Sequence, residues 1–136
     1  MSLFSFSGTP PTDLGVTNGQ LKSCPSTPNC VCSQAPAEDT EHAIAPFPYT
    51  GSAKDAIANL KQIIEGMERS TINKVTDDYL YAEFSSKLMG FVDDVEFFAP
   101  AGESIIHTRT AARMGKSDLG VNRKRTEEIR AKFAAA

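Results

Sequence analysis

The sequence predicts an α+β fold in which two helices pack on an antiparallel meander sheet of four to five strands, preceded by an irregular N-terminal arm. Three observations predict it: a helical apolar period begins near Ser52, strand-like runs follow between residues 70 and 113, and a second helical pattern ends the chain. We expect residues 1–40 to form the arm and residues 41–136 a single domain. A chain of 136 residues, of which 40% are hydrophobic, is sufficient for one core.

The first 40 residues are rich in Pro, Gly, Ser, Thr and Asn and have no sustained apolar period. This composition predicts irregular structure. Residues 42–47 have the character of a short strand, but Pro46 and Pro48 lack backbone donors and would confine it to a sheet edge.

The segment after Ser52 carries the clearest helical pattern, with apolar residues at spacings of three and four along one face: Ala53, Ala56, Ile57, Leu60, Ile63, Ile64 and Met67. Ser52, with Asp55 three residues later, resembles a capping box. Gly66 marks the expected end of the helix.

Four strand-like runs follow, at about 70–76, 79–86, 91–98 and 104–113. Asp77 and Asp78 provide turn chemistry between the first two runs, Gly90 separates the second from the third, and residues 100–103 separate the third from the fourth. Short connections of this kind predict a meander.

The last hairpin allows a register to be predicted. A turn centred on Ala101 and Gly102 places Glu96 opposite His107, and Asp94 opposite Arg109. Consecutive strand residues point to opposite faces, so Asp93 and Asp94 cannot form a catalytic carboxylate dyad or chelate one metal ion. This geometry argues against a hydrolase.

A final helix is expected from about residue 122 to 133, with Asn122 as a candidate N-cap. Asp93 lies on the mostly apolar face of the hairpin and therefore requires a partner. We predict a structural ion pair between Asp93 and Arg123 that fixes this helix to the sheet.

Three segments carry a family resemblance: residues 24–33 (CPSTPNCVCS), residues 90–96 (GFVDDVE) and residues 108–125 (TRTAARMGKSDLGVNRKR). Together they resemble the domain of unknown function 1499 family over the chain from about residue 20 to its end. That family is associated with bacteria, including cyanobacteria, and with plastid-bearing organisms. The resemblance implies no established activity. Cys32 stands where relatives more often carry a small polar residue, which argues against a thiol role shared by the family.

Three cysteines, Cys24, Cys30 and Cys32, fall within nine residues. In a reducing compartment we expect free thiols, with a Cys24–Cys30 disulfide as the first alternative. A zinc site with His42 as the fourth ligand is the last alternative, because the spacing does not match the usual paired ligands. We therefore predict no metal and no cofactor.

The net charge of −3 gives no field that would favour nucleic acid, although basic residues crowd the last quarter of the chain. No run approaches the roughly 20 apolar residues of a membrane-spanning helix, and the first residues lack the pattern of a signal peptide. We expect a cytoplasmic protein, with peripheral membrane association left open.

Three functions compete. The first is a noncatalytic binding or accessory protein whose arm docks on a protein partner in a larger assembly, photosynthetic if the source is a phototroph. The second is a binding protein or enzyme for a small anion or phosphometabolite, for which the candidate residues are Arg109, Arg113, Ser117, Asn122 and Arg123. The third is a thiol redox or metal module at the three cysteines. No residue is assigned a catalytic role, and the balance favours a protein that is not an enzyme.

Overall fold

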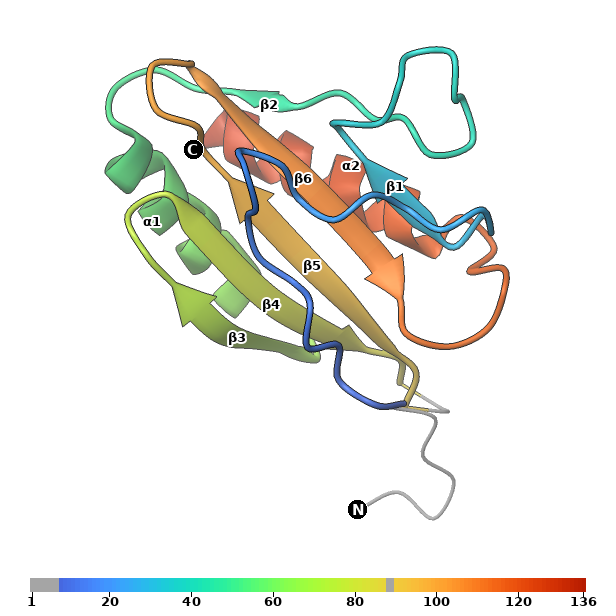
Figure 1. Ribbon diagram of the computed structural model, residues 1–136. Helices are drawn as coiled ribbons and strands as arrows, with labels where there is room; N and C mark the ends of the chain where they lie inside the picture. The colour runs from blue at the N-terminus through green and yellow to red at the C-terminus, as the bar shows by residue number, and fades with distance from the viewer. Residues whose placement is uncertain (1–7, 88–89) are drawn as a thin grey trace.

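The computed structural model describes residues 8–87 and 90–136 (Figure 1). Its elements, in chain order, are β1 (Cys30–Cys32), β2 (Phe47–Pro48), α1 (Ala53–Glu65), β3 (Ser70–Val75), β4 (Tyr79–Ser85), β5 (Val92–Phe98), β6 (Ile105–Ala112) and α2 (Val121–Ala135). The predicted α+β class is therefore confirmed.

The strands form one antiparallel sheet in the order β1-β6-β5-β4-β3, and β2 pairs with the start of β6. Strands β3 to β6 are the predicted meander. Two details differ from the expectation. The predicted boundary at residue 40 falls after β1, which pairs with β6 and belongs to the sheet. The short strand expected within 42–47 is shifted to Phe47 and Pro48.

Helix α1 begins and ends where the sequence predicts. The Ser52 hydroxyl accepts a hydrogen bond from the Asp55 amide, and the Gly66 amide donates to carbonyls of the last turn. The helix buries Ile57, Leu60 and Ile64 against the sheet, as its apolar period requires.

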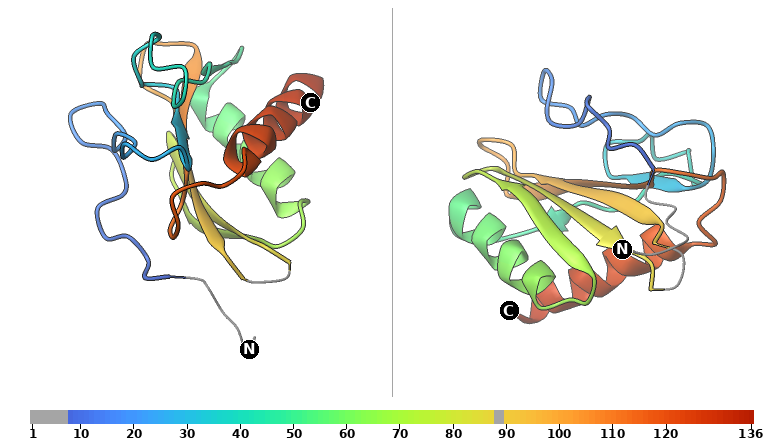
Figure 2. Two further views of the ribbon diagram at one scale, coloured as in Figure 1. Left: turned by 90° about the vertical axis from the view of Figure 1, so that its right-hand side faces the viewer. Right: turned by 90° about the horizontal axis from the view of Figure 1, so that it is seen from below.

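Both helices cover the same face of the sheet, and the arm runs across the other face (Figure 2). The main core lies between helices and sheet, with Phe47, Leu60, Phe97, Ile106 and Ile129 among its buried members. Among the described residues, the arm side carries a smaller apolar cluster, made by Leu21, Tyr79 and Phe98. The arm side also carries buried charged residues of β5 and β6, and this asymmetry positions the candidate site.

The predicted register of the β5–β6 hairpin is wrong by two residues. Glu96 lies opposite Arg109 instead of His107, Asp94 lies opposite Ala111 instead of Arg109, and His107 faces Phe98. The observed pairs, from Asp93 with Ala112 to Phe98 with His107, are centred between Gly102 and Glu103, one residue later than predicted. A shift of two residues preserves the faces because side chains alternate with a period of two. Asp93 and Asp94 therefore do point to opposite faces.

Helix α2 begins at Val121, and Asn122 is not its N-cap. Asp118 performs the capping: its carboxylate accepts hydrogen bonds from the amides of Gly120 and Asn122. Asn122 is fully buried inside the first turn, where its side-chain oxygen accepts a hydrogen bond from the Thr110 hydroxyl at 2.5 Å. Its role is to join α2 to β6.

Candidate functional site

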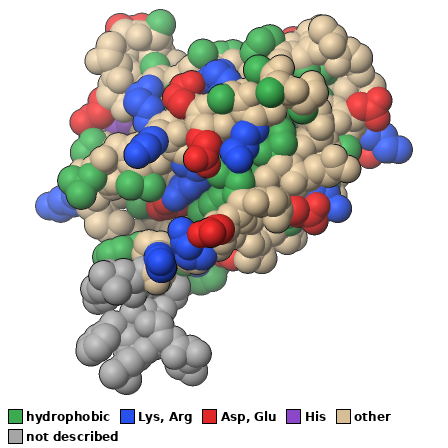
Figure 3. Space-filling view, turned by 180° about the vertical axis from the view of Figure 1, so that it is seen from behind, with side chains coloured by type: hydrophobic (Ala, Val, Ile, Leu, Met, Phe, Trp, Pro, Cys, Tyr) green, Lys and Arg blue, Asp and Glu red, His purple; other side chains and the backbone are tan. Residues whose placement is uncertain are grey.

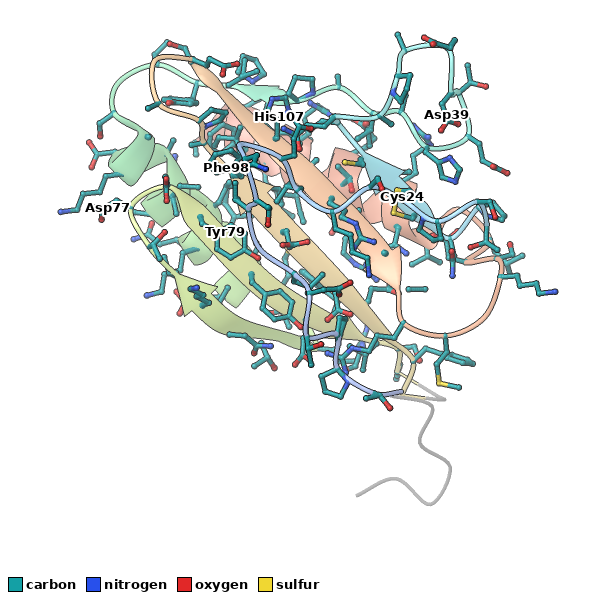
Figure 4. All side chains as sticks on the ribbon, viewed as in Figure 1. Cys24, Asp39, Asp77, Tyr79, Phe98 and His107 are labelled. Carbon is teal, nitrogen blue, oxygen red and sulfur yellow. A yellow bond between two sulfur atoms is a disulfide. The ribbon has the colours of Figure 1, made fainter. Side chains whose placement is uncertain are left out.

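The sheet face under the arm is made of polar side chains that are nevertheless buried (Figure 4). Glu96 is 0% exposed, Asp94 2% and Arg109 4%. These side chains come from β5 and β6 and are flanked by tyrosines of β4. Burying charged groups costs free energy unless each forms a hydrogen bond or an ion pair. A buried charged residue that has such partners is therefore structural, and one that has none is a candidate functional residue.

Glu96 is held by the arm and by β4. One carboxylate oxygen, Oε2, accepts a hydrogen bond from the Tyr79 hydroxyl at 2.5 Å and another from the Gly15 amide at 2.8 Å. Burial raises the pKa of Glu96 and also that of Tyr79. The second oxygen, Oε1, is buried without a hydrogen-bond partner among the described residues.

Arg113, just after β6, is saturated by acidic partners. Its guanidinium donates to both oxygens of Asp94, at 2.9 and 3.0 Å, and to Glu83. The Tyr81 hydroxyl donates to the same Asp94 carboxylate at 2.5 Å, and burial together with this bond raises the pKa of Tyr81 to about 12. Hydrogen bonding to Asp94 raises the pKa of Arg113 further above its ordinary value. Arg113 is therefore a structural residue.

Arg109, four residues earlier and within β6, differs from Arg113. Its side chain makes no hydrogen bond and no ion pair within residues 8–87 and 90–136, and its Nε is a buried donor without an acceptor. Glu96 lies opposite it and Cys32 lies on its other side, in β1. A buried guanidinium in this condition is unfavourable for folding alone, which makes it a candidate functional group.

Arg109 lines a cavity of about 390 Å³ between the sheet and the arm. The small side chain of Ala111 lies between Arg109 and Arg113 in the sequence and also lines the cavity. The arm side of the cavity is formed by Pro11, Leu14 and residues 22–25, and Asp94, Ala112 and Arg113 complete the lining. Lys22 is a third cation of the lining, and it pairs with Asp13 at 2.7 Å. We call this space the Arg109 pocket.

On the helix side, Asp93 forms the predicted buried ion pair, but with a different arginine. Arg125 lies 2.9 Å from its carboxylate and also stacks over the Phe84 ring, whereas Arg123 donates to the carbonyls of Thr40 and Glu41. In α2, position 125 therefore faces the sheet, and position 123 faces the loop that contains Thr40 and Glu41. Burial raises the pKa of Asp93 despite this pair.

The structure does not bring the five candidate anion-binding residues together. Arg109 and Arg113 lie on the arm side, whereas Asn122 is buried on the helix side. An anion at the start of α2 would need unoccupied backbone amides. Two of these amides donate to Asp118 instead, and the Ser117 hydroxyl accepts from the Leu119 amide. The helix N-terminus is therefore not an anion site in this conformation.

The cysteines divide into a bridge and a thiol. Cys24 and Cys30 form a disulfide, so the expectation of free thiols is wrong for these two, whereas Cys32 is free and buried. Figure 4 shows the bridge beside the arm. Among the described residues, no group of three or more His, Cys, Asp or Glu side chains is arranged to hold a metal ion.

His42 clamps the loops on either side of β1. Its Nδ1 lies 2.8 Å from an Asp39 carboxylate oxygen and its Nε2 lies 2.9 Å from the Thr27 carbonyl oxygen. Both partners can only accept, so both ring nitrogens donate and the imidazole is protonated. The hydrogen bond to Thr27, supported by the one to Asp39, raises the pKa of His42.

The basic residues at the end of the chain do not form a surface of one sign. On the helix side, blue and red side chains are interspersed (Figure 3), in keeping with ion pairs such as Arg130 with Glu127. In the part of the chain that the structure describes, no helix is long and apolar enough to cross a membrane.

Sequence reasoning found Arg109 and Arg113 but missed the arm side of the pocket. Lys22 and the neighbouring arm residues have no periodic pattern that would place them on the sheet. The available signal was the polar alternation of Tyr79, Tyr81 and Glu83 with apolar residues in β4, which indicates a polar sheet face. Alternation alone does not indicate whether such a face is covered.

A comparison with protein-family models places the chain among known families. The family model described as "Protein of unknown function (DUF1499)" matches residues 20–133, which includes every strand and most of α2. A search of curated proteins finds no match.

Proposed function

We propose that this chain, which belongs to the DUF1499 family of proteins of unknown function, binds a small organic acid in the Arg109 pocket. The observation that carries the proposal is the side chain of Arg109, which is 4% exposed, lines the pocket and has no partner among the described residues. A carboxylate is the complementary group, because its two oxygens match the paired donors of a guanidinium.

The charge around the pocket favours a single carboxylate over a phosphate. Arg113 is neutralised by Asp94 and Glu83, and Lys22 pairs with Asp13. Arg109 is then the cation of the lining that has no ion pair among the described residues. Asp94 and Glu96 nearby would repel a dianion more strongly than a ligand with a single negative charge.

The rest of the lining favours an acid with a compact apolar body. Pro11, Leu14, Pro25 and the two alanines of β6 provide apolar contacts. The volume of about 390 Å³ lies within the range of small-molecule sites, near its lower end. Binding of this kind requires no catalytic group, which agrees with the expectation of a noncatalytic protein.

A titration calorimetry series tests the proposal with benzoate, acetate, inorganic phosphate and benzylamine as probes. We expect benzoate to bind most tightly, acetate and phosphate weakly, and benzylamine not at all. If benzoate binds with a Kd near 1 mM, a concentration of 10 mM stabilises the protein by about 1.4 kcal/mol, which thermal unfolding also detects.

Two variants with the same loss of charge locate the site. Arg109→Met should remove benzoate binding, whereas Arg123→Met should retain it because Arg123 lies outside the pocket and bonds backbone carbonyls. Ala111→Leu should also block binding by filling the space between the arginines. Benzoate binding that survives Arg109→Met, or is lost only in Arg123→Met, would contradict the assignment.

The hypothesis of an accessory protein with a docking arm receives less support. An arm used for docking was expected to be available to a partner, but Leu21 is buried, and the Gly15 amide and the Leu21 amide bond Glu96 and Gln34 of the same chain. These contacts hold the arm on its own chain at residues 15 and 21, whereas residues 16–20 are exposed. The anion-binding hypothesis is therefore the one that we carry forward.

A further inference from the structure

Beside the Arg109 pocket, the three cysteines are arranged so that Cys24 has two possible partners. Cys30 and Cys32 are two residues apart in β1, so their side chains point to the same sheet face. Cys24 approaches that face from the arm and is bonded to Cys30. Cys24 and Cys32 both line a second cavity, of about 240 Å³, with Gln20, Gln34 and Asp39 among the other lining residues.

We propose that this cluster is a thiol–disulfide exchange site in which Cys24 alternates between Cys30 and Cys32. In the exchange, the Cys32 thiolate attacks Cys24 Sγ, a Cys24–Cys32 bond forms, the Cys24–Cys30 bond breaks, and Cys30 leaves as the thiolate that takes up the proton lost by Cys32. The number of disulfides and thiols is unchanged, so the step needs no external oxidant or reductant.

The cavity supplies the route for the attack. Cys24 and Cys32 both line this cavity, so the space between the sheet and the arm is shared by the attacking and the attacked residue. Asp39 also lines the cavity, and its carboxylate is bonded to His42. Burial raises the pKa of the Cys32 thiol, while the charge of Arg109 opposes this effect and that of Glu96 reinforces it. Exchange is therefore expected to be slow near neutral pH and faster above pH 8.

The exchange would alter the Arg109 pocket. Cys30 lies beside Ala111 and Cys32 lies beside Arg109, so moving the bridge displaces the attachment of Cys24 by roughly 7 Å along β1. Cys24 lines the Arg109 pocket as well as the second cavity. This consequence rests on the proposed function, whereas the exchange itself does not.

Differential alkylation of the oxidised wild-type protein tests the exchange. The protein is incubated at pH 8.5, its free thiol is labelled with N-ethylmaleimide, the disulfide is reduced, and the released thiols are labelled with iodoacetamide. Fragmentation of the peptide then shows whether Cys30 or Cys32 was free. We expect the maleimide label mainly on Cys32 and, increasingly with time, on Cys30. A label confined to Cys32 after prolonged incubation would overturn the proposal.

Two variants provide an independent test that does not depend on the rate in the wild type. Cys30→Ser, folded and treated with oxidised glutathione, should form a Cys24–Cys32 disulfide, whereas Cys32→Ser should retain Cys24–Cys30 as the matched control. A Cys30→Ser protein that keeps glutathione on Cys24 while Cys32 stays a thiol would overturn the proposal. Circular dichroism spectra of both variants establish that the fold is retained.

Benzoate titration of the same two oxidised variants tests the link to the pocket. We expect the Kd values of the Cys24–Cys32 and Cys24–Cys30 forms to differ at least fivefold. Equal Kd values would refute the link but leave the exchange intact. Absence of benzoate binding in both variants and in the wild type would refute the proposed function, and the alkylation result would still decide the exchange.

Discussion

Replacing Arg109 with methionine should make the protein more stable. Arg109 is almost completely buried and has no hydrogen-bond or ion-pair partner among the described residues. Methionine has a similar length and no charge to desolvate. Replacing a buried charge with an apolar side chain of similar volume is often neutral or stabilising by about 1–4 kcal/mol. A binding residue that is unfavourable for folding commonly shows this behaviour.

The neighbouring carboxylate reduces the expected gain. The charge of Arg109 opposes the burial-driven increase in the pKa of Glu96, so its removal leaves Glu96 in a less favourable environment. We therefore expect a net stabilisation of about 1–2 kcal/mol, near the lower end of the range. For a chain of this size, that corresponds to an increase in Tm of roughly 3–8 °C.

Arg113→Met is the matched comparison, because Arg113 is on the same sheet face and its side chain is equally buried. Its loss leaves Asp94 and Glu83 without their cation and should destabilise the protein by about 3–5 kcal/mol. Urea unfolding of both variants and of the wild type measures the two effects. If Arg109→Met is destabilised by more than 1 kcal/mol, both alone and combined with Glu96→Gln, Arg109 is a structural residue and our reasoning is wrong.

Three further predictions concern the fold. The His42 clamp should stabilise the protein below pH 6.5 and lose its effect as the pH rises through the raised pKa of His42 in the folded state. The difference in Tm between the wild type and His42→Gln should therefore shrink from pH 5.5 to pH 9. A difference that stays constant over this range would refute the protonated clamp. Asn122→Ala should cost about 2 kcal/mol in urea unfolding, because it removes the acceptor of the buried Thr110 hydroxyl and one of the hydrogen bonds to Asp118. The double variant Asn122→Leu with Thr110→Val should cost less, and the opposite order would contradict the buried network. Ser52→Ala should cost about 1 kcal/mol through loss of the α1 cap, with no change in benzoate affinity, and an unchanged stability would show that the cap contributes nothing.

The fold was predictable where local signals agreed with one another. The period of α1, its Ser52 cap and Gly66 all indicate the same helix, and the turn residues between strands allow few topologies other than a meander. The register of the β5–β6 hairpin was harder to predict, because it depends on the conformation of residues 99–104. Two neighbouring registers both place opposite charges in contact, Asp94 with Arg109 in the predicted one and Glu96 with Arg109 in the observed one.

The partner of Asp93 illustrates a second limit. The sequence correctly indicated that a carboxylate on the apolar face needs a guanidinium from α2, because burial without one is too costly. Selecting Arg125 rather than Arg123 required knowing which face of α2 is buried, and that face carries Asn122, Thr126 and Ile129. The sequence did not reveal it, because Asn122 was interpreted as an N-cap, whereas Asp118 caps the helix and Asn122 is buried.

The arm explains why the candidate site itself was not predictable. Polar alternation in a strand normally indicates a face in contact with water, where Glu96 and Arg109 would need no partners. The arm changes this expectation, because covering the face removes water and leaves every group beneath it in need of a partner. Tyr79 donates to Glu96, and Tyr81 and Arg113 donate to Asp94, whereas the side chain of Arg109 has no partner among the described residues. An arm that served only stability would gain more by covering an apolar face, so the retained guanidinium beneath it is best understood as part of a binding site.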